Sequence, residues 1–509
     1  MDQTKTKVAT EKDPNKKLSI DRIACKCKAC YTSPCFLFKL SLFLFSTACV
    51  IILSMTEIYE TAILQVLTLE EGGVVYDIWK SPSTEMNIRI YPFNYTNIDR
   101  IGEEKPHVKE LGPYVFKERL QKINITFNDN GTLTYSENRT HEFDPTLSNG
   151  ALDDVIYTPN VPFMSAAAQG AEKGVLTQIA LAAFLKGLDT RPFLPVNILE
   201  FADGFDDDFS TVARKLTSIL KGKTPPKFGM LAGRTGVKPD KITIGTGMND
   251  LDNFGSVSAY DGQTILKYWK TEECNKITGS DGNFFPPRIV QKKSRVHIYI
   301  ASFCRRIPLV YNGTEKIVND FPSKRFEVPL DVFSTPEENP DNACFCEKKK
   351  CEPSGTFSTS KCNFGAPVSI SLPHFLNGDK ELRTNVTGLN PDLEKHKFYM
   401  DLHSIFGLPM SGRMRFQINV VVHHCPFLTQ LKDIPDGTIL PIAWMEIGIG
   451  EVQGFAKDVI YHATYTAYYL KQLLLWSSFG IMLLTFFCLC ISLRKNNKIV
   501  MTEIVEILD

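Results

Sequence analysis

The chain has 509 residues, of which 57 are basic and 57 acidic, so its formal net charge is zero. This balance gives no overall attraction to nucleic acid, and a hydrophobic fraction of 43% is ordinary for a globular protein. The apolar residues are concentrated in two blocks near the chain ends, which indicates a membrane protein with a large globular part between two spans.

The first apolar block runs from Phe36 to Met55 and contains one charged residue, Lys39. A lysine near the end of a span can extend to the lipid head groups, so we predict a transmembrane helix over residues 36–56. A cleaved signal peptide is the alternative, but the leader is unusually long and no small-residue cleavage site follows the block. The leader carries eight basic residues: Lys5, Lys7, Lys12, Lys16, Lys17, Arg22, Lys26 and Lys28.

The second block, Leu473 to Leu493, is 21 residues long and carries no charge. As a helix this length crosses a hydrocarbon core of roughly 30 Å, and Trp476 is placed as an interfacial anchor would be, so we predict a span over residues 471–493. Basic residues follow it: Arg494, Lys495 and Lys498. Because cytoplasmic flanks are enriched in Lys and Arg, we expect cytoplasmic tails over residues 1–35 and 494–509.

This topology places residues 57–470 outside the cell or in an organelle lumen. Six N-glycosylation sequons lie in this segment and none in either tail: Asn94, Asn124, Asn130, Asn138, Asn312 and Asn385. Their distribution agrees with the charge rule, and we predict that they are glycosylated.

The cysteines divide in the same way. Those beside the spans on the cytoplasmic side are candidates for palmitoylation, with unmodified thiols and, more remotely, a metal site as alternatives: Cys25, Cys27, Cys30, Cys35, Cys488 and Cys490. Seven cysteines remain on the outer side, and four of them fall within 19 positions: Cys344, Cys346, Cys351 and Cys362. A disulfide-bonded loop fits better than a zinc site, because the spacing lacks paired CxxC motifs.

Between the spans, the first predicted element is a helix over Glu57–Leu69. Short alternating segments then predict antiparallel strands at residues 88–93, 114–116, 123–127 and 133–135. From Phe163 to Lys227 the apolar residues recur at helical spacing, so we predict one Ala-rich helix over Ser165–Leu188 and another over Asp208–Leu220.

Strand patterning resumes after this helical insertion, at residues 241–245, 295–303, 309–311 and 368–372. We expect the sheet to end with a long strand over Arg413–Val422, in which Met414, Phe416, Ile418 and Val420 share one face. One large ectodomain over residues 57–470, with a helical insertion in an antiparallel sheet, is therefore expected.

No enzyme signature is complete in the sequence. Gly255–Ala259 lacks the second glycine of GxSxG, and His141-Glu142 lacks the second histidine of a zincin. Gly448–Gly454 is similar to a dinucleotide loop but precedes a span rather than a Rossmann crossover. His423 and Cys425 could converge on one face of a strand, although a strand end with a free thiol is the preferred interpretation. We expect no enzymatic activity, no cofactor and no metal.

Six motifs resemble those of the class B scavenger receptors: Leu111-Gly112-Pro113-Tyr114, Phe285-Pro286-Pro287, Glu338-Asn339-Pro340-Asp341-Asn342, Cys344-Phe345-Cys346, Ser371-Leu372-Pro373-His374-Phe375 and Gly388-Leu389-Asn390-Pro391. The family includes fatty-acid translocase, the high-density-lipoprotein receptor, a lysosomal integral membrane protein and insect sensory neuron membrane proteins. The resemblance spans nearly the whole chain. It implies a large α+β ectodomain with an antiparallel β-barrel-like core, an apolar tunnel and a helical apex.

The resemblance also implies a disulfide pattern and a ligand site. The implied pairs are Cys274 with Cys344, Cys304 with Cys362, and Cys346 with Cys351, which leaves Cys425 free. In the family the apex receives the ligand, and here it corresponds to about residues 163–227. A basic residue of the family's first apical helix matches Lys186 approximately, but its neighbouring lysine is replaced by Gly187. Lys173 and Arg191 could add positive charge there, with a simply solvated helix face as the alternative.

The function implied by the resemblance is a cell-surface receptor for lipids, fatty acids, sterols, carotenoids or lipoprotein particles that passes apolar cargo to the membrane, with a monomer and a homo-oligomer as alternative states. One alternative is a lysosomal trafficking receptor for a lumenal protein, which the acidic, dileucine-like tail Glu503–Leu508 would favour. Another is a sensory co-receptor for hydrophobic odorants. We accordingly expect the plasma membrane, with an endosomal or lysosomal membrane as the alternative location.

Overall fold

The structure is a computed structural model and describes residues 33–82, 86–205, 208–222, 227–346 and 351–508. The chain divides into two compact units. A terminal unit is formed by the segments up to residue 63 and from residue 460, and an ectodomain unit by residues 64–459.

The terminal unit contains two long apolar helices. α2 (Pro34–Met55) begins at Ser33, whose hydroxyl accepts a hydrogen bond from the backbone N–H of Phe36. α14 (Ala467–Leu508) follows a π-helical turn at His462–Thr466. Both helices are long and apolar enough to cross a membrane, which confirms the two predicted spans as helices.

The two apolar helices run antiparallel within this unit. Lys39 donates a hydrogen bond to Ser492 Oγ over 3.2 Å near one end of the pair. The Tyr59 hydroxyl donates to the backbone carbonyl of Ala467 over 2.7 Å near the other. The two chain ends therefore leave the helix pair on the same side.

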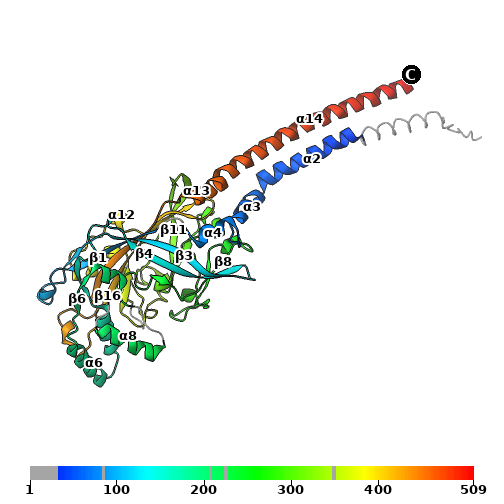
Figure 1. The fold of residues 1–509 in the computed structure, drawn as a ribbon. Helices are drawn as coiled ribbons and strands as arrows, with labels where there is room; N and C mark the ends of the chain where they lie inside the picture. The colour runs from blue at the N-terminus through cyan, green and yellow to red at the C-terminus, as the bar shows by residue number, and fades with distance from the viewer. Residues whose placement is uncertain (1–32, 83–85, 206–207, 223–226, 347–350, 509) are drawn as a thin grey trace, which may run out of the picture. The chain divides into compact units, whose positions relative to one another are not determined.

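The core of the ectodomain is one antiparallel sheet, whose strands follow the order β10-β11-β12-β15-β16-β17-β1-β3-β4-β8-β9 (Figure 1). These strands are β1 (Met86–Tyr95), β3 (Tyr114–Asn128), β4 (Thr132–Phe143), β8 (Ile242–Gly245), β9 (Val257–Tyr260), β10 (Val296–Ile300), β11 (Arg305–Val318), β12 (Phe321–Glu327), β15 (Tyr399–His403), β16 (Pro409–Val421) and β17 (Ile439–Ile449). The two ends of the sheet approach each other through Ser280, which bridges Ser256 beside β9 and Ile298 in β10. The sheet is thus a nearly closed barrel, as predicted.

Shorter elements complete the fold: α3 (Ile58–Val66), α4 (Val74–Lys80), α9 (Glu272–Asn275), α10 (Pro287–Gln291), α11 (Lys380–Asn385), α12 (Leu393–His396), α13 (Gly454–Tyr461), β2 (Val108–Glu110), β7 (Gly236–Val237), β13 (Thr356–Ser358) and β14 (Val368–Ser371). The helical insertion comprises α5 (Val161–Ala171), α6 (Val175–Gly187), α7 (Ile198–Asp203) and α8 (Asp208–Lys221). Figure 1 shows α6 and α8 together at one end of the ectodomain, which we call the apex.

The strands β1, β17 and β16 separate an apolar inner face from a polar outer face. On the inner face Ile88 pairs with Ile447, which in turn pairs with Met414. These residues belong to or pack on the main hydrophobic core. The row one position along lies on the outer face and is charged: Arg89, Glu446 and Arg415. This alternation is the period of two that a strand imposes on its side chains.

Two predictions about the insertion were wrong. The predicted single helix over Ser165–Leu188 is two helices, because the chain turns at Lys173 and Gly174 caps the start of α6 in an extended conformation. The insertion is also not wholly helical, since β6 (Phe193–Asn197) pairs with β5 (Val155–Pro159) in a small separate sheet.

The sheet was underestimated in two places. The strands predicted at residues 114–116 and 123–127 are parts of the single strand β3, because the inward-facing polar residues Glu118 and Lys122 interrupt its apolar pattern. The sheet also does not end at Val422, because β17 follows and lies at its centre between β16 and β1. Gly448, the first residue of the segment whose likeness to a dinucleotide loop was rejected above, is a residue of β17.

Candidate functional site

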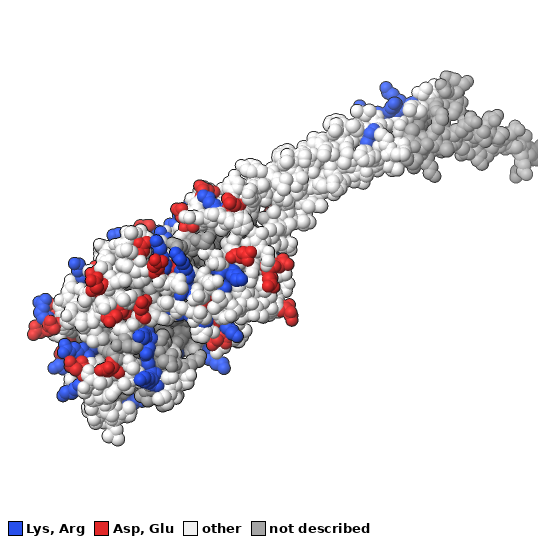
Figure 2. All heavy atoms as spheres, viewed as in Figure 1, with Lys and Arg blue, Asp and Glu red and all other residues white. Residues whose placement is uncertain are grey.

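The apical helix α6 displays apolar side chains to solvent. Leu176 is 84% exposed, Ile179 45% and Phe184 42%, while the buried residues of the helix are Gln178 and Leu185. In Figure 2 the tip of the ectodomain where Figure 1 places α6 is almost free of charged side chains. Contiguous exposed apolar surface on a folded domain is typical of an interaction site.

The packing of α6 on α5 explains which of its faces stays outside. A Cβ at Gly170 of α5 would lie 2.4 Å from Leu181 Cδ2 of α6, so the glycine permits a close approach. α5 also buries Phe163 and Met164 in the core that contains Ile447 of β17. α6 is therefore held by α5, and Leu176 and Ile179 lie on the face turned away from Leu181, where they stay exposed.

The three basic residues predicted for ligand binding flank this apolar face and do not form one cluster. Lys173 precedes α6 and Lys186 lies in its last turn, so they stand at opposite ends of a helix about 20 Å long. Arg191 pairs with Asp189 over 3.2 Å, with both side chains mostly exposed. Lys186 carries its positive charge where the helix dipole favours it.

The inner wall of the barrel is apolar along β16. Met414, Phe416 and Ile418 pack against the main core, yet each is only partly buried. Phe416 also contacts the ring of Phe303 edge-to-face at 5.3 Å. These side chains retain free surface on the inner face of a nearly closed sheet, which is what an apolar passage requires.

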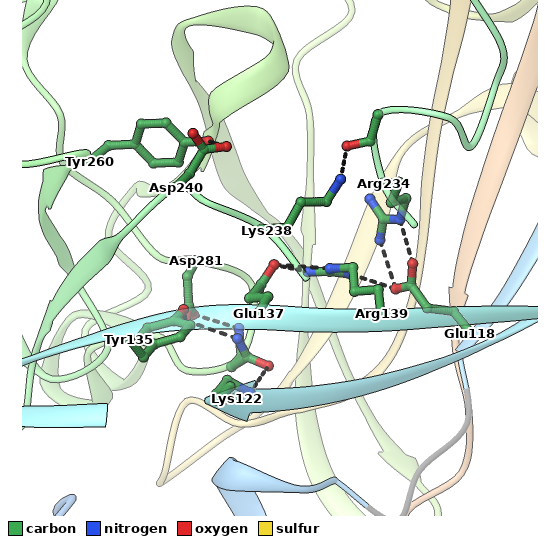
Figure 3. Close-up of polar contacts among 12 residues, drawn as sticks. Glu118, Lys122, Tyr135, Glu137, Arg139, Arg234, Lys238, Asp240, Tyr260 and Asp281 are labelled. Carbon is green, nitrogen blue, oxygen red and sulfur yellow. Dashed lines mark hydrogen bonds and ion pairs between the residues drawn. The ribbon is translucent and has the colours of Figure 1, made fainter. Parts of the chain in front are cut away.

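The inner wall along β3 and β4 is instead ionic (Figure 3). The buried Glu118 carboxylate accepts hydrogen bonds from Arg139 (2.5 Å) and Arg234 (2.5 and 2.9 Å) and is bonded to His141 Nε2 (2.7 Å). Burial alone would raise the pKa of Glu118, but Arg234, His141 and Arg139 together hold it far below its usual range. Because Arg234 follows the insertion in sequence, this network ties the segment leaving the apex to the sheet.

A second interior polar group lies farther along β3. Lys122 is fully buried and donates to the backbone carbonyl of Trp79 over 2.8 Å and, more weakly, to Asn283 (3.4 Å). Burial lowers the pKa of Lys122 to about 8. Nearby, the Tyr135 hydroxyl donates to Asp281 over 2.7 Å. These inward polar groups were missed from the sequence, where they resemble the outward residues of an ordinary half-exposed strand.

Two of the expected disulfides are present in the structure. Cys274 is bonded to Cys344 and Cys346 to Cys351, with Cα atoms 6.5 and 4.6 Å apart. The first bond joins α9 to the start of the cysteine-rich loop.

The third expected pair is present as two thiols, which departs from the predicted bond. Cys304 and Cys362 lie in hydrogen-bond contact, and this contact together with burial raises the pKa of Cys304. The sulfurs are thus neighbours, and their oxidation to a disulfide stays a prediction. Cys425 is a buried free thiol.

The sequons differ in accessibility. Asn124, Asn130, Asn312 and Asn385 are exposed, whereas Asn94 and Asn138 are partly buried. Asn94 accepts a hydrogen bond from the backbone N–H of Tyr157 through its side-chain oxygen, which leaves its amide nitrogen available. Glycosylation of all six stays a prediction.

The palmitoylation candidates are only partly visible. Cys35 is exposed and Cys488 and Cys490 are partly buried, whereas Cys25, Cys27 and Cys30 lie outside the described residues. Among the residues that the structure describes, no group of three or more His, Cys, Asp or Glu side chains could hold a metal ion.

Comparison with known proteins identifies the relatives of this arrangement. The model of the CD36 family matches residues 37–493. The chain belongs to the CD36 family. Scavenger receptor class B member 1 of Mus musculus is 30% identical to this CD36-family chain over 400 residues, which cover 78% of the chain and 77% of the relative. Lysosome membrane protein 2 of Rattus norvegicus is 30% identical over 391 residues, covering 75% and 79%. The resemblance deduced from the six motifs is thereby confirmed.

Proposed function

We propose that this CD36-family chain is a cell-surface receptor that captures lipids or lipoprotein particles at α6 and passes apolar cargo through the barrel to the membrane. The exposed apolar face of α6 carries the proposal. A lipid monolayer accepts Leu, Ile and Phe side chains at the boundary between acyl chains and head groups. Lys173 and Lys186, at the two ends of that face, are placed to meet anionic head groups.

The hydrophobic core supports a route from the apex into the barrel. One continuous core contains Phe163 of α5, Leu185 of α6 and Met445 of β17. The partly exposed Met414 and Phe416 lie farther along the same inner face. Apolar cargo that entered at the apex would thus meet apolar side chains along the β16–β17 side of the barrel.

The terminal unit supports anchoring at both ends. The antiparallel α2 and α14 carry the chain ends to one side, and basic residues flank both predicted spans on that side. The positive-inside rule makes this side cytoplasmic. We therefore place the ectodomain outside the plasma membrane, where the predicted disulfides and glycans can form.

A lysosomal receptor for a lumenal protein is the second candidate. The relatives support a lysosomal location as much as a scavenger-receptor function, because a lysosome membrane protein and a scavenger receptor are equally similar to this chain at 30% identity. An exposed apolar helix could also dock a protein. The choice between the two candidates therefore depends on what α6 binds.

The experiment compares two substitutions of equal exposure. Ile179 on α6 and Leu147 in the loop after β4 are 45% and 46% exposed, so Ile179→Asp and Leu147→Asp make nearly the same chemical change. Cells expressing each full-length variant would be incubated with fluorescent emulsion particles of phosphatidylcholine, phosphatidylserine and cholesteryl ester. Since burying an Ile side chain contributes about 1.5–3 kcal/mol, Ile179→Asp should weaken particle binding by at least about ten-fold at equal surface expression.

Leu147→Asp should bind particles as the wild type does. If Ile179→Asp also bound them normally, α6 would not be the lipid-docking surface. In that case, capture of a lumenal protein that Ile179→Asp abolishes would favour the lysosomal candidate.

A further inference from the structure

A group of three arginines converges on one carboxylate on the outer face of the barrel, away from the apex. Arg89 Nη1 and Arg413 Nε both contact Glu446 Oε1, at 2.9 and 3.3 Å. Arg415 takes the other oxygen, with its Nε and Nη2 at 2.8 and 2.7 Å from Oε2. Neighbouring strands supply the four residues, since β1, β17 and β16 lie side by side. Three guanidinium groups against one carboxylate leave a local excess of two positive charges.

The three arginines differ in how many of their N–H donors are already hydrogen-bonded. Arg415 is saturated, because its remaining Nη1 donates to the backbone carbonyls of Lys397 and Glu394. Within the described part of the chain, Arg89 contacts only Glu446, and Arg413 adds only the carbonyl of Gly412. A guanidinium group has five N–H donors, so most donors of Arg89 and Arg413 are free to bind something else.

These two free guanidinium groups meet over a glycine. A Cβ built at Gly448 would lie 2.8 Å from Arg413 Nη1 and 3.3 Å from Arg89 Nη1, so the two Nη1 atoms are no more than about 6.1 Å apart. The side chains of Arg89 and Arg413 remain 23% and 30% exposed. Because Gly448 has no side chain, the two guanidinium groups come together over it as a pair of partly exposed cations.

A fourth residue lies beside this pair of arginines. Asn87 is the β1 partner of Gly448, and its side-chain oxygen is buried without a hydrogen-bond partner. An anion that also carries a hydroxyl group could donate to this oxygen. A hydrogen phosphate or a phosphomonoester has both features, whereas a carboxylate has no hydroxyl.

We infer that Arg89, Arg413 and Gly448 form a binding site for a phosphate group. Planar guanidinium forks match the oxygens of phosphate with paired, charge-assisted hydrogen bonds. A purely structural role does not require this arrangement, because one arginine would neutralise Glu446, and Arg415 already binds it through two nitrogens. The phosphate is either a free ion or small phosphomonoester, or the head group of a lipid, and the test separates these sources.

The test uses the full-length protein in non-ionic detergent. Binding of inorganic phosphate would be measured by calorimetry for the wild type and for Arg413→Gln, Gly448→Ala and Glu446→Gln. Arg100→Gln is the matched control, because Arg100 is an exposed arginine that also pairs with one glutamate. The head-group arm measures flotation with vesicles of phosphatidylcholine alone and of phosphatidylcholine mixed with phosphatidic acid.

Arg413→Gln and Gly448→Ala should each weaken phosphate binding by about ten-fold, the first by removing a charged donor and the second because its Cβ would push the two guanidinium groups apart. Glu446→Gln should strengthen it, because the competing carboxylate charge is gone, whereas a merely structural cluster would only lose stability. Arg100→Gln should have no effect. Each variant's unfolding midpoint without phosphate shows whether it is folded.

The effects of the variants on the two measurements show whether the phosphate is a soluble ion or part of a lipid head group. Free phosphate binding that follows this order supports a site for a soluble phosphate, and flotation with phosphatidic acid that follows the same order supports a lipid head group. If neither measurement changes in folded Gly448→Ala, or if Glu446→Gln weakens both, the inference is overturned.

Discussion

Acidification from pH 7.4 to 5 should destabilise the ectodomain, chiefly through two buried histidines. His396 is 4% exposed and His403 is fully buried. The Nδ1 atom of His396 accepts a hydrogen bond from the backbone N–H of Asp392, and that of His403 accepts from those of Ile405 and Phe406. A proton on either Nδ1 atom would turn this acceptor into a donor. The protonated nitrogen would then face the backbone N–H groups that donate to it at neutral pH.

The pKa values agree with this geometry. Burial and the adjacent His374 lower the pKa of His396 to about 4, and burial lowers that of His403 to about 3. The groups that face His396 are Glu110 and Asp392, which oppose the shift, and Arg415, which adds to it. Since both folded pKa values lie below the unfolded value near 6.5, the unfolded state binds more protons in acid, and stability is lost as the pH falls below about 6.5.

The loss can be estimated for pH 5. Each histidine contributes about 2 kcal/mol, or roughly 4 kcal/mol together, a large part of a typical stability of 5–15 kcal/mol. An ectodomain of roughly 400 residues has an unfolding entropy of about 0.8 kcal/mol per degree, so the midpoint should fall by about 5 °C.

The assay is thermal unfolding of the purified full-length protein at both pH values. The double variant His396→Asn/His403→Asn should lose the part of the pH dependence that these two residues contribute, because an asparagine oxygen can accept the same backbone hydrogen bonds and does not titrate. A smaller pH dependence should remain, since burial also lowers the pKa of His297 to about 4. The exposed His107 provides the control substitution His107→Asn, which should keep it. A wild-type midpoint that is equal at pH 7.4 and 5 would refute the reasoning. A clear fall would favour the plasma membrane over the lysosome as the working location.

Four further predictions concern the ectodomain. Glu118→Gln should lower the free energy of unfolding by about 3–5 kcal/mol, because it leaves buried guanidinium groups without their carboxylate. Urea unfolding would measure this loss, and a value below about 1 kcal/mol would contradict a structural role of the network. Cys274→Ser opens the 70-residue loop closed with Cys344, worth roughly 4 kcal/mol, so the protein should be retained inside the cell, and normal surface arrival would argue against that estimate. Lys186→Glu should reduce binding of particles containing phosphatidylserine, and added salt should do the same in the wild type; unchanged binding would exclude this charge from docking. Met414→Trp should leave particle binding intact while reducing lipid uptake, and normal uptake would exclude a passage along β16.

The sequence could predict the elements that are surrounded by apolar groups on all sides over a long run, and those with one apolar and one polar face. The two spans are long runs without charge, and β16 alternates because its two faces differ. β17 gave no such signal. Ten of its eleven residues are buried, since its inner face packs in the core and segments carrying His374 and His396 cover part of its outer face. A strand buried on both faces reads as a continuous apolar run, so its period disappears.

The candidate sites, too, could be predicted only in part from the sequence. Lys186 could be selected in advance because it lies in a helical segment that corresponds to the family's apex. The apolar face of α6 could not, because Leu176 and Ile179 have the spacing of an ordinary core-facing stripe. Arg89 and Arg413 are more than 300 residues apart in the sequence, and each resembles a single solvated charge on a strand. Only the register of β1, β17 and β16 brings them together over Gly448.

The ionic side of the barrel constrains where the proposed passage can run. Glu118 and Lys122 point inward from β3, and a hydrocarbon chain against them would offer no hydrogen bond to a buried charge. Their own partners, Arg234 and the carbonyl of Trp79, already satisfy them and occupy the adjacent space. Apolar cargo would therefore find a more favourable contact surface along β16 and β17, which β1 separates from β3. The network also anchors the segment after the apex, while α5 anchors the apex to the apolar wall, so the apex is attached to both walls of the barrel.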